Sequence, residues 1–421
     1  MKLIILCILP FILISCWYFQ RWESQETTHI AEILNWERTD SIMESLWELW
    51  ENPETQRPHT NLQPAFEWQT RISGIETQTD INIEQIAQLS WVIWSIVQLP
   101  SDNLLVTLRS WTFSILTPDG DVLHEWIETW LNLSAARQGG LLDVELAPDY
   151  SETSRIFFSF SESFESGTIA SVAKWILNEE EWILSEQEVI FRATPSYRWN
   201  MHYGSRLTFD SDGNLFASFW ERSDRGIRDS AQDENTFLWS IVYITQDWEP
   251  VNPEWNGFIL PELFSIGHRN PQWLVYDRGT SKLWSSEMWP RGWDEINLIL
   301  PGKNFGWPIV SFGEEYSWFP VWDGIAELED MEQPRYYWDP AVSPSWIDIY
   351  RWDIEEWNGN LIIWNLSWQM IIRLVIDWDT IVAEEWLFSE MWERFRDVHS
   401  GRDGNLYLAT DSGKIFTVSP R

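Results

Sequence analysis

Short apolar runs that alternate with polar turn clusters fill the chain from about residue 81 to its end. The runs are rich in Ile, Leu, Val, Phe and Trp and are bounded by Gly, Pro, Asn and Asp. This pattern is typical of β-strands, whereas an amphipathic helix repeats its apolar positions every three or four residues. Nothing in this region predicts a helix longer than a few turns, so the pattern indicates an all-β domain.

One unit recurs in the region: a turn of Pro, Asp, Gly or Asn followed by a strand that opens with an apolar residue. Its copies begin at Pro100, Pro148, Asp212, Asp277, Asn358 and Asp403. Spacings of roughly 45 to 80 residues fit one copy per four-stranded blade of a β-propeller, with insertions between some blades. The repeat therefore predicts a six-bladed β-propeller over residues 81–421.

The first residues follow a different pattern. Residues 1–15 hold one lysine and then an apolar run of about 13 residues, shorter than the roughly 17 to 25 residues of a membrane-spanning helix. The run predicts a secretory signal peptide over residues 1–16, and Leu13-Ile14-Ser15-Cys16 resembles the bacterial lipobox, whose cysteine is lipidated. An ordinary signal peptide with an incidental cysteine is the alternative. Cys7 lies in the segment that would be removed, which excludes a disulfide framework.

Residues 17–80 are rich in Glu, Gln, Thr and Asn and lack a sustained strand pattern, although residues 41–50 could form one short helix. We expect a polar tether that holds the propeller away from a membrane. With Cys16 as a lipid anchor, the protein would be extracytoplasmic, in the periplasm or on the cell surface. The anchor would then be its only membrane contact.

Charge narrows the range of partners. The chain carries 28 Lys and Arg against 65 Asp and Glu, a formal net charge of −37, without any basic stretch. This composition excludes nucleic acid as a partner, because affinity for phosphate backbones depends on clustered Lys and Arg. An apolar fraction of 44% supports a large core and excludes global disorder.

Tryptophan is more frequent than glycine. The chain has 34 Trp and 20 Gly, although glycine normally supplies about 7% of residues. Several Trp, among them Trp248 and Trp378, stand where the neighbouring residues favour a turn glycine. A bulky aromatic residue is poorly suited to the positive φ of such turns, so this excess requires a cause.

Six motifs follow one another between residues 88 and 418. They begin at Arg137 (RQGGLLD), His202 (HYGSRL), Gly267 (GHRNPQ), Pro290 (PRG, then DEIN from Asp294), Gly302 (GKNFGWP) and Arg394 (RFRDV). In this order they resemble the quinoprotein glucose/sorbosone dehydrogenases, which include the soluble aldose sugar dehydrogenases. The resemblance implies a six-bladed propeller that uses pyrroloquinoline quinone (PQQ) and calcium. Its implied reaction oxidises the anomeric C1 hydroxyl of an aldose to the lactone and passes electrons to an acceptor that the sequence does not identify.

The resemblance assigns His202 as the general base, because a neutral imidazole can accept the anomeric hydroxyl proton while hydride leaves. Arg269 and Asn270 match the pair at the reactive carbonyls of the cofactor, where a fixed guanidinium stabilises developing negative charge. Gln138 would form a hydrogen bond near the reacting centre. A packing histidine and an arginine that braces a loop are the structural alternatives.

Arg394 and Arg396 are two residues apart, so on a strand both would point to the same face. Two guanidiniums suit a tricarboxylate such as the quinone cofactor, and surface salt bridges are the alternative. Trp338 matches the aromatic residue that covers the flat cofactor, with a core tryptophan as the alternative. Ser367 replaces a cofactor-binding lysine of some glucose-oxidising members, which favours the aldose-dehydrogenase branch.

Calcium prefers oxygen ligands, including backbone carbonyls. In the family a Gly-Pro dipeptide supplies two carbonyls to the ion, and the matching positions here are Trp289 and Pro290. Asp294 matches a nearby supporting aspartate, for which a surface carboxylate is the alternative.

The same comparison suggests a cause for the excess of tryptophan. Where the family has glycine, this chain has Trp111, Trp220, Trp239, Trp248, Trp273, Trp289, Trp293, Trp346, Trp364 and Trp378. Trp94, Trp307 and Trp338 match tryptophans of the family. We interpret the first group as UGA codons read as Trp although the source reads UGA as Gly. A diverged protein that tolerates Trp at these places is the alternative.

Two other functions stay open. The chain could be a propeller that binds sugar or protein without catalysis, since this fold hosts many unrelated functions. It could also be a calcium-dependent lactonase, which needs Asp, Asn and Glu side chains around the ion. Neither requires His202 and Arg269 together with the pair Arg394 and Arg396, so this combination favours the dehydrogenase.

Overall fold

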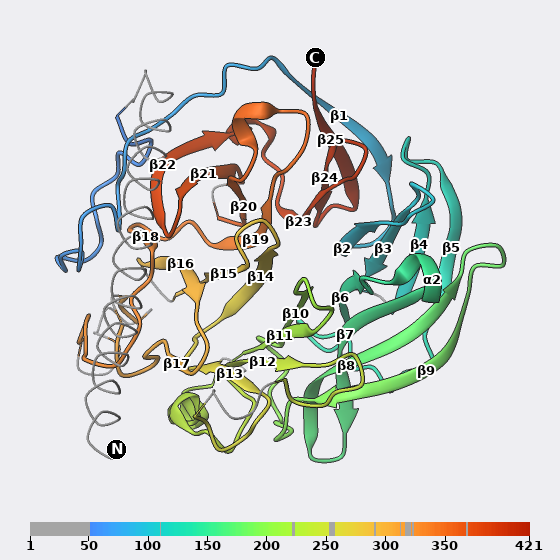
Figure 1. Cartoon of the computed structure of the whole chain (residues 1–421), viewed down its shortest axis with the longest axis horizontal. Helices are drawn as coiled ribbons and strands as arrows, with labels where there is room; N and C mark the ends of the chain where they lie inside the picture. The colour runs from blue at the N-terminus through green and yellow to red at the C-terminus, as the bar shows by residue number, and fades with distance from the viewer. Residues whose placement is uncertain are drawn as a thin grey trace, which may run out of the picture. The chain divides into compact units, whose positions relative to one another are not determined.

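The computed structural model describes residues 51–109, 111–220, 224–251, 257–289, 292–311, 313–315, 321, 324–367 and 369–421. These belong to one compact unit, Glu51–Arg421. Its six small sheets stand around a central axis as the blades of a propeller (Figure 1). The prediction of a six-bladed all-β propeller is therefore confirmed.

Each blade has four antiparallel strands, ordered here from the axis outward. Blade 1 has β2 (Ile93–Gln98), β3 (Leu104–Leu108), β4 (Thr112–Leu116) and β5 (Val122–Glu128), and blade 2 has β6 (Leu141–Leu146), β7 (Arg155–Phe164), β8 (Gly167–Asn178) and β9 (Ile183–Arg192). Blade 3 has β10 (Gly204–Phe209), β11 (Leu215–Phe219), β12 (Ser240–Ile244) and β13 (Leu263–Ile266), to which β17 (Lys303–Asn304) adds in parallel.

The remaining strands complete the ring. Blade 4 has β14 (Pro271–Asp277), β15 (Lys282–Glu287), β16 (Asp294–Ile299) and β18 (Tyr336–Trp338), and blade 5 has β19 (Pro344–Ile349), β20 (Leu361–Asn365), β21 (Ile371–Asp377) and β22 (Thr380–Leu387). Blade 6 has β23 (Phe395–Ser400), β24 (Leu406–Thr410), β25 (Lys414–Pro420) and β1 (Ile81–Gln88). The described helices are α2 (Tyr150–Thr153) and the 3₁₀ helices Arg225–Gln232, Glu355–Trp357 and Ser389–Met391.

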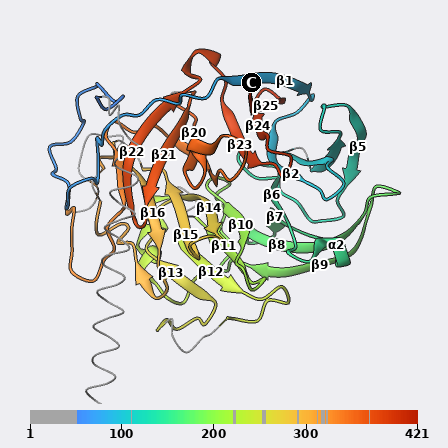
Figure 2. The same ribbon diagram turned by 45° about the horizontal axis from the view of Figure 1, so that its top comes forward.

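The ring closes through strands from both ends of the chain. β1 pairs antiparallel with β25, from Ile81 opposite Pro420 to Gln88 opposite Lys414. Figure 2 shows β1 beside β25 in the same blade. This pairing covers an edge of the C-terminal hairpin that would otherwise present unpaired backbone groups.

The six sequence repeats correspond to one turn in each blade. Every copy connects the innermost strand to the second strand, as Asp212-Gly213-Asn214 does between β10 and β11. The second strands that follow, such as β20, are buried along their length because blades pack on both of their faces. This explains why they read as continuous apolar runs.

All six inner strands carry a register shift near their first residues, for example between Pro271 and Trp273 in β14. Side chains of the neighbouring blade bond to backbone groups there. The N–H of Leu207 donates to Oδ2 of Asp143 at 2.7 Å, and the N–H of Ile96 donates to Asp397. Bulges of this kind redirect side chains and are frequent beside active sites.

Residues 51–80, the described part of the predicted tether over 17–80, pack against blades 4 and 5 (Figure 1). The N–H groups of His59 and Thr60 donate to the Asp339 carboxylate at 2.8 and 2.9 Å, and Gly74 forms a bridge with Glu384. The compact unit thus begins at Glu51 rather than at residue 81. The predicted signal peptide, Cys16, the rest of the tether and its short helix lie outside the described residues. Among described residues, no helix has the length and apolar character that a membrane crossing requires.

Among the residues that the structure describes, eight tryptophans have a left-handed backbone, with φ between 54° and 101°: Trp68, Trp111, Trp182, Trp239, Trp248, Trp293, Trp378 and Trp392. The turn positions predicted at Trp248 and Trp378 are confirmed by their φ values of 64° and 58°. A left-handed backbone costs a residue with a Cβ roughly 1 to 2 kcal/mol. Eight such residues are a large burden for a domain, whose stability is usually about 5 to 15 kcal/mol.

Candidate functional site

Most of the predicted site residues lie in the loops that lead into the inner strands. Gln138 precedes β6, His202 precedes β10, Arg269 and Asn270 precede β14, and Arg394 precedes β23. Neighbouring inner strands contact one another around the axis and run in the same direction, so their first residues meet at one end of the propeller. We call these residues the site rim.

His202 and Gln138 are in direct contact. The backbone N–H of His202 donates to Oε1 of Gln138 at 2.8 Å. His202 has a left-handed φ of 48°, and its side chain is partly exposed. The Trp220 ring lies 6.0 Å from the imidazole, centroid to centroid, with the planes nearly perpendicular. Gln138 therefore fixes the backbone of the predicted base.

Arg269 and Asn270 are almost fully buried, with exposed fractions of 5% and 1%. The Arg269 guanidinium donates to the carbonyl of Met288, and its centre lies 5.7 Å from the ring centroid of Trp307. Oδ1 of Asn270 is buried without a hydrogen-bond partner among the described residues. A buried acceptor without a donor costs free energy, which indicates a place for a ligand that donates a hydrogen bond.

The buried carboxylate of Glu287 binds the backbone of the loop that carries Arg269 and Asn270. Glu287 accepts hydrogen bonds from the N–H of Arg269 at 3.0 Å and of Asn270 at 3.4 Å. Its other oxygen lies 2.6 Å from Nδ1 of His268, whose Nε2 lies 2.7 Å from Oγ of Ser265. The sequence did not identify Glu287 or His268, although a histidine directly before Arg269 was a usable signal. Both groups fix Arg269 and Asn270 from inside the blade.

The predicted calcium position lies at the end of β15. The N–H of Trp289 donates to Oδ1 of Asp294 at 2.8 Å, and the N–H of Ser343 donates to Oδ2 at 2.5 Å. Burial raises the pKa of Asp294 to about 6, although these two N–H groups oppose the shift. Asp294 therefore holds the backbone at Trp289, as a supporting residue should. Pro290 lies outside the described residues, and the described residues contain no cluster of three His, Cys, Asp or Glu side chains suited to a metal.

Arg394 and Arg396 both face Asp411. Nε of Arg396 lies 2.6 Å from Oδ1 of Asp411, and Nε of Arg394 lies 3.5 Å from Oδ2. The two side chains therefore share a face, and they form the salt bridges that were the alternative to cofactor binding. Arg396 also lies over the ring of Trp94 at 5.0 Å, which holds its guanidinium at the start of β2.

Trp338 lies away from the site rim. It belongs to β18, the outermost strand of blade 4, and only 2% of it is exposed. Its Nε1 donates to Glu384 in blade 5 at 2.7 Å. In this position Trp338 packs as a core residue opposite Asp294 of β16, and its role as a cover for the cofactor stays a prediction. Ser367 is hydrogen-bonded to the hydroxyl of Ser343.

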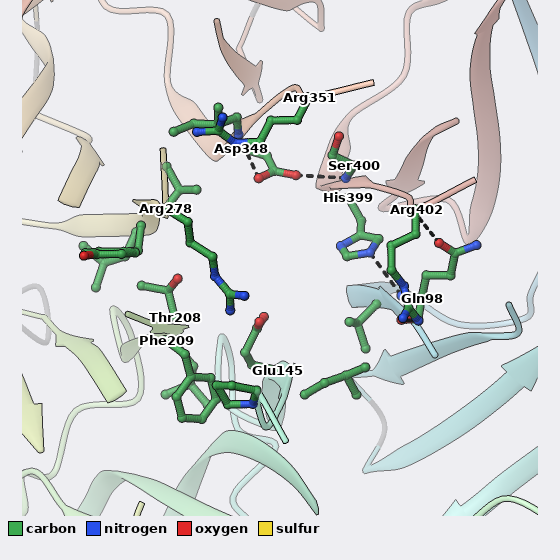
Figure 3. Close-up of a pocket in the computed structure, with 18 of the residues that line it drawn as sticks. Gln98, Glu145, Thr208, Phe209, Arg278, Asp348, Arg351, His399, Ser400 and Arg402 are labelled. Atoms are coloured by element: carbon green, nitrogen blue, oxygen red, sulfur yellow. Dashed lines mark hydrogen bonds between the residues drawn. The ribbon is translucent and has the colours of Figure 1, made fainter. Parts of the chain in front are cut away.

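A cavity of about 420 Å³ opens at the other end of the channel, where the inner strands end (Figure 3). None of the predicted site residues lines it. Burial raises the pKa of Glu145 to about 8 and lowers that of His399 to about 4. Arg206, which lines this cavity, forms an ion pair with Asp143 and lies 3.4 Å over the ring of Trp346. No site residue was predicted from the sequence at this cavity.

Known proteins share the sequence and the fold of this chain. A family model described as Glucose / Sorbosone dehydrogenase matches residues 91–417. Aldose sugar dehydrogenase YliI of Escherichia coli (strain K12) is 32% identical over 362 residues, which cover 81% of this chain and 93% of that protein. An uncharacterized protein of Synechocystis, slr1608, is 34% identical over 339 residues, 76% of this chain and 81% of that protein.

Solved structures agree. A crystal structure of glucose dehydrogenase has a TM-score of 0.76 and 33% identity, and the match covers 81% of this chain and 100% of the other. The PQQ-bound aldose sugar dehydrogenase of Streptomyces coelicolor shares the fold, with a TM-score of 0.68 at 24% identity over 82% of this chain and 99% of the other. These matches confirm the resemblance found in the motifs. The chain belongs to the glucose/sorbosone dehydrogenase family.

Proposed function

We propose that this protein oxidises the anomeric C1 hydroxyl of an aldose to the lactone, with PQQ as the hydride acceptor and calcium bound beside it. The observation that carries the proposal is the arrangement of the site rim. The Gln138–His202 contact and the buried pair Arg269 and Asn270 lie on loops that enter three consecutive inner strands, β6, β10 and β14. A base and a fixed cation are thus presented at the same end of the channel.

His202 supplies the proton acceptor in this proposal. A neutral imidazole that accepts the C1 hydroxyl proton allows hydride to leave the same carbon. Gln138 restrains the backbone of His202 through the 2.8 Å hydrogen bond, so the backbone position from which the imidazole extends is fixed. A fixed base needs less reorganisation than one on a free loop.

Arg269, Asn270 and Arg396 would hold the cofactor. The Arg269 guanidinium is buried and braced by the Met288 carbonyl, so its charge is fixed and poorly screened. Oδ1 of Asn270, which has no partner among the described residues, would accept a hydrogen bond. Arg394 and Arg396 would release Asp411 and bind carboxylates of the cofactor in its place. Trp289 would present its carbonyl to calcium, with Asp294 holding that backbone. When bound, the quinone supplies a two-electron acceptor and calcium supplies a Lewis acid.

The proposal includes the location of the protein. The apolar run and Cys16 in the sequence favour export and lipidation, and an extracytoplasmic position would give the enzyme access to external sugars. The acceptor that takes electrons from the reduced cofactor is a separate partner. The propeller would reach that partner while anchored by its lipid.

Reconstitution tests the reaction. Purified protein with glycine at the ten positions where the family has glycine is incubated with PQQ and calcium, and reduction of an electron-accepting dye is followed with a panel of aldoses, while NMR identifies the product. We expect dye reduction and a lactone only when both the cofactor and an aldose are present. Sugar binding by calorimetry without dye reduction would favour the non-catalytic propeller, and hydrolysis of an added lactone without dye reduction would favour the lactonase.

A further inference from the structure

We infer that the native chain carries glycine at thirteen positions written as tryptophan, and that glycine at two of them opens the cofactor pocket. The thirteen are the ten positions where the family has glycine together with Trp68, Trp182 and Trp392, which the backbone alone identifies. The assignment of glycine is independent of any activity. The statement about the pocket rests on the proposed function.

Left-handed φ values are concentrated in tryptophan to a degree that side-chain chemistry does not explain. Only a few per cent of non-glycine residues have positive φ, and Asn and Asp dominate among them. Here at least eight of the 34 tryptophans have it. Trp94, Trp307 and Trp338, the tryptophans that match the family, are absent from this group. Five of the ten positions where the family has glycine belong to the group, namely Trp111, Trp239, Trp248, Trp293 and Trp378, so the backbone supports half of that set independently.

The chain itself contains the glycine form of the same turn. The N–H of Trp248 donates to the carbonyl of Thr245 at 3.0 Å, and the N–H of Gly120 donates to that of Thr117 at 3.0 Å. In both loops the turn residue is left-handed, with φ of 64° at Trp248 and 89° at Gly120. Trp111 occupies the third loop residue between β3 and β4 with φ of 101°. Glycine is the usual residue at this left-handed position of a three-residue hairpin loop.

Burial does not offset the strain at the exposed turns. The exposed fractions are 51% for Trp111, 47% for Trp248, 54% for Trp378 and 79% for Trp392. In the hairpin between β21 and β22, Asp377 pairs with Thr380, so Trp378 is the first residue of a two-residue loop. That position favours glycine or asparagine. The Trp248 ring lies edge-on to Phe191 at 6.1 Å and the Trp378 ring lies 4.2 Å from Nζ of Lys282, but both side chains stay about half exposed.

At the site rim the tryptophans occupy the space that a cofactor needs. The Trp220 indole covers Gly204 so closely that a Cβ on Gly204 would lie 2.2 Å from its Cδ1. Its Nε1 donates at 2.5 Å to the carbonyl of Pro271, the residue after Asn270. The indole therefore extends from the His202 loop to the Asn270 loop.

Trp289 fills the adjacent space. Its ring packs edge-on against Trp307 with centroids 5.0 Å apart, and the same Trp307 ring carries the Arg269 guanidinium at 5.7 Å. Trp289 is also the predicted source of a carbonyl ligand to calcium. With glycine at 220 and 289, one indole is removed beside the His202 ring and another beside Trp307, the ring that contacts Arg269. The freed space suits a flat, tricyclic anion held by the fixed polar groups.

The identity of the thirteen residues is tested on protein purified from the source organism. Peptide mass spectrometry should give the mass of glycine at all thirteen positions and of tryptophan at Trp94, Trp307 and Trp338. Tryptic peptide 374–394 contains Trp378, Trp392 and Trp386, so one spectrum compares assigned and unassigned positions. The coding DNA should have UGA at the thirteen codons and UGG at the three controls. Tryptophan masses, or a mixture of both codons within the thirteen, would overturn the assignment.

Stability provides a second test with recombinant chains. Glycine at the four exposed left-handed positions, Trp111, Trp248, Trp378 and Trp392, should raise the Tm, because each substitution relieves backbone strain without leaving a cavity. A matched chain with glycine at Trp175 and Trp284, which are buried strand residues, should have a lower Tm, because these substitutions leave cavities. An equal fall of Tm in both chains would contradict the role of φ.

Calorimetry with PQQ and calcium tests the pocket. The double variant Trp220→Gly and Trp289→Gly should bind PQQ at least tenfold more tightly than the chain with both tryptophans, while Trp175→Gly should bind no more tightly. Equal affinities in the two chains would overturn the pocket statement. If glycine is found in the native protein but neither chain binds PQQ, the proposed function fails and the residue assignment stands.

Discussion

Oε1 of Gln138 accepts a 2.8 Å hydrogen bond from the backbone N–H of His202 and so joins the loops that precede β6 and β10. The two residues are 64 positions apart in sequence. Their contact exists only because neighbouring inner strands of a propeller begin at the same end. The hydrogen bond links the side chain of Gln138 to the backbone of His202, the predicted base.

Replacing His202 by glutamine should lower kcat by roughly 10² to 10⁴, the usual contribution of general-base catalysis. Cofactor affinity should stay within a few-fold, because Arg269, Asn270 and Arg396 hold the cofactor. Steady-state kinetics and calorimetry measure the two quantities in protein with glycine at the assigned positions. His124→Gln, on the outer strand β5, is the control and should behave as the parent protein. A large loss of PQQ affinity with normal kcat would make His202 a binding residue.

Gln138→Leu should lower kcat by up to about tenfold, because a single hydrogen bond contributes about 0.5 to 1.5 kcal/mol. Gln138→Glu keeps an acceptor oxygen and should retain most of the activity. The kcat and the Tm are measured for both variants, since a displaced base should lower kcat at an unchanged Tm, whereas a loss of folding would lower the Tm. Full activity in Gln138→Leu would show that the contact has no positioning role.

Calcium and PQQ should bind cooperatively if Trp289 presents its carbonyl to the ion beside the cofactor. Removal of calcium by a chelator should weaken PQQ binding, and by linkage PQQ should strengthen calcium binding by the same factor. Isothermal titration in both orders measures the two factors. Identical PQQ affinity with and without chelator would contradict a shared site at Trp289.

Glu145 should make stability depend on pH. Burial raises the pKa of its carboxyl from 4.5 to about 8, with Arg206 opposing, so between these pH values the folded state binds more protons than the unfolded state. The contribution of Glu145 to the free energy of unfolding is therefore fully present below pH 4.5 and is lost as pH rises through about 8. Glu145→Gln removes this titration, and its Tm should rise relative to the parent protein across the same window.

The size of this effect follows from the shift, since one pKa unit corresponds to about 1.4 kcal/mol. Melting curves from pH 4.5 to 9 measure the effect. The difference in Tm between Glu145→Gln and the parent protein removes the contributions of other groups that titrate in this range, such as Asp348. Glu181→Gln, an exposed loop variant, should show a pH-independent difference. A parallel course of the Glu145→Gln and parent curves would place the Glu145 pKa near its ordinary value.

The mature protein should begin at a lipidated Cys16. Mass spectrometry of the N-terminal peptide from the membrane fraction should show a diacylglyceryl modification on the cysteine. Cys16→Ser should release the protein from the membrane. An unmodified terminus beyond Cys16, or a retained signal peptide, would contradict the anchor.

Local sequence patterns were sufficient to predict the strands and turns of the blades. Alternating apolar runs and Asp, Gly and Asn turns act over fewer than ten residues, and they identified the hairpin between β10 and β11 and its five counterparts. The same local rule marked Trp248 and Trp378 as positions for a left-handed turn residue, which their φ values confirm. The motifs around His202 and Arg269 identified the family, because motif order along a chain is visible without a structure.

Tertiary structure decided which groups meet. Glu287 holds the Arg269 loop, Asp411 faces Arg394 and Arg396, and Trp338 is buried against Glu384 in the next blade. These contacts join residues from different strands or blades. A sequence pattern specifies periodicity and turns, whereas the partner of a buried polar group depends on how the ring closes. The ring therefore determined which charges are paired, and the sequence determined that a ring would form.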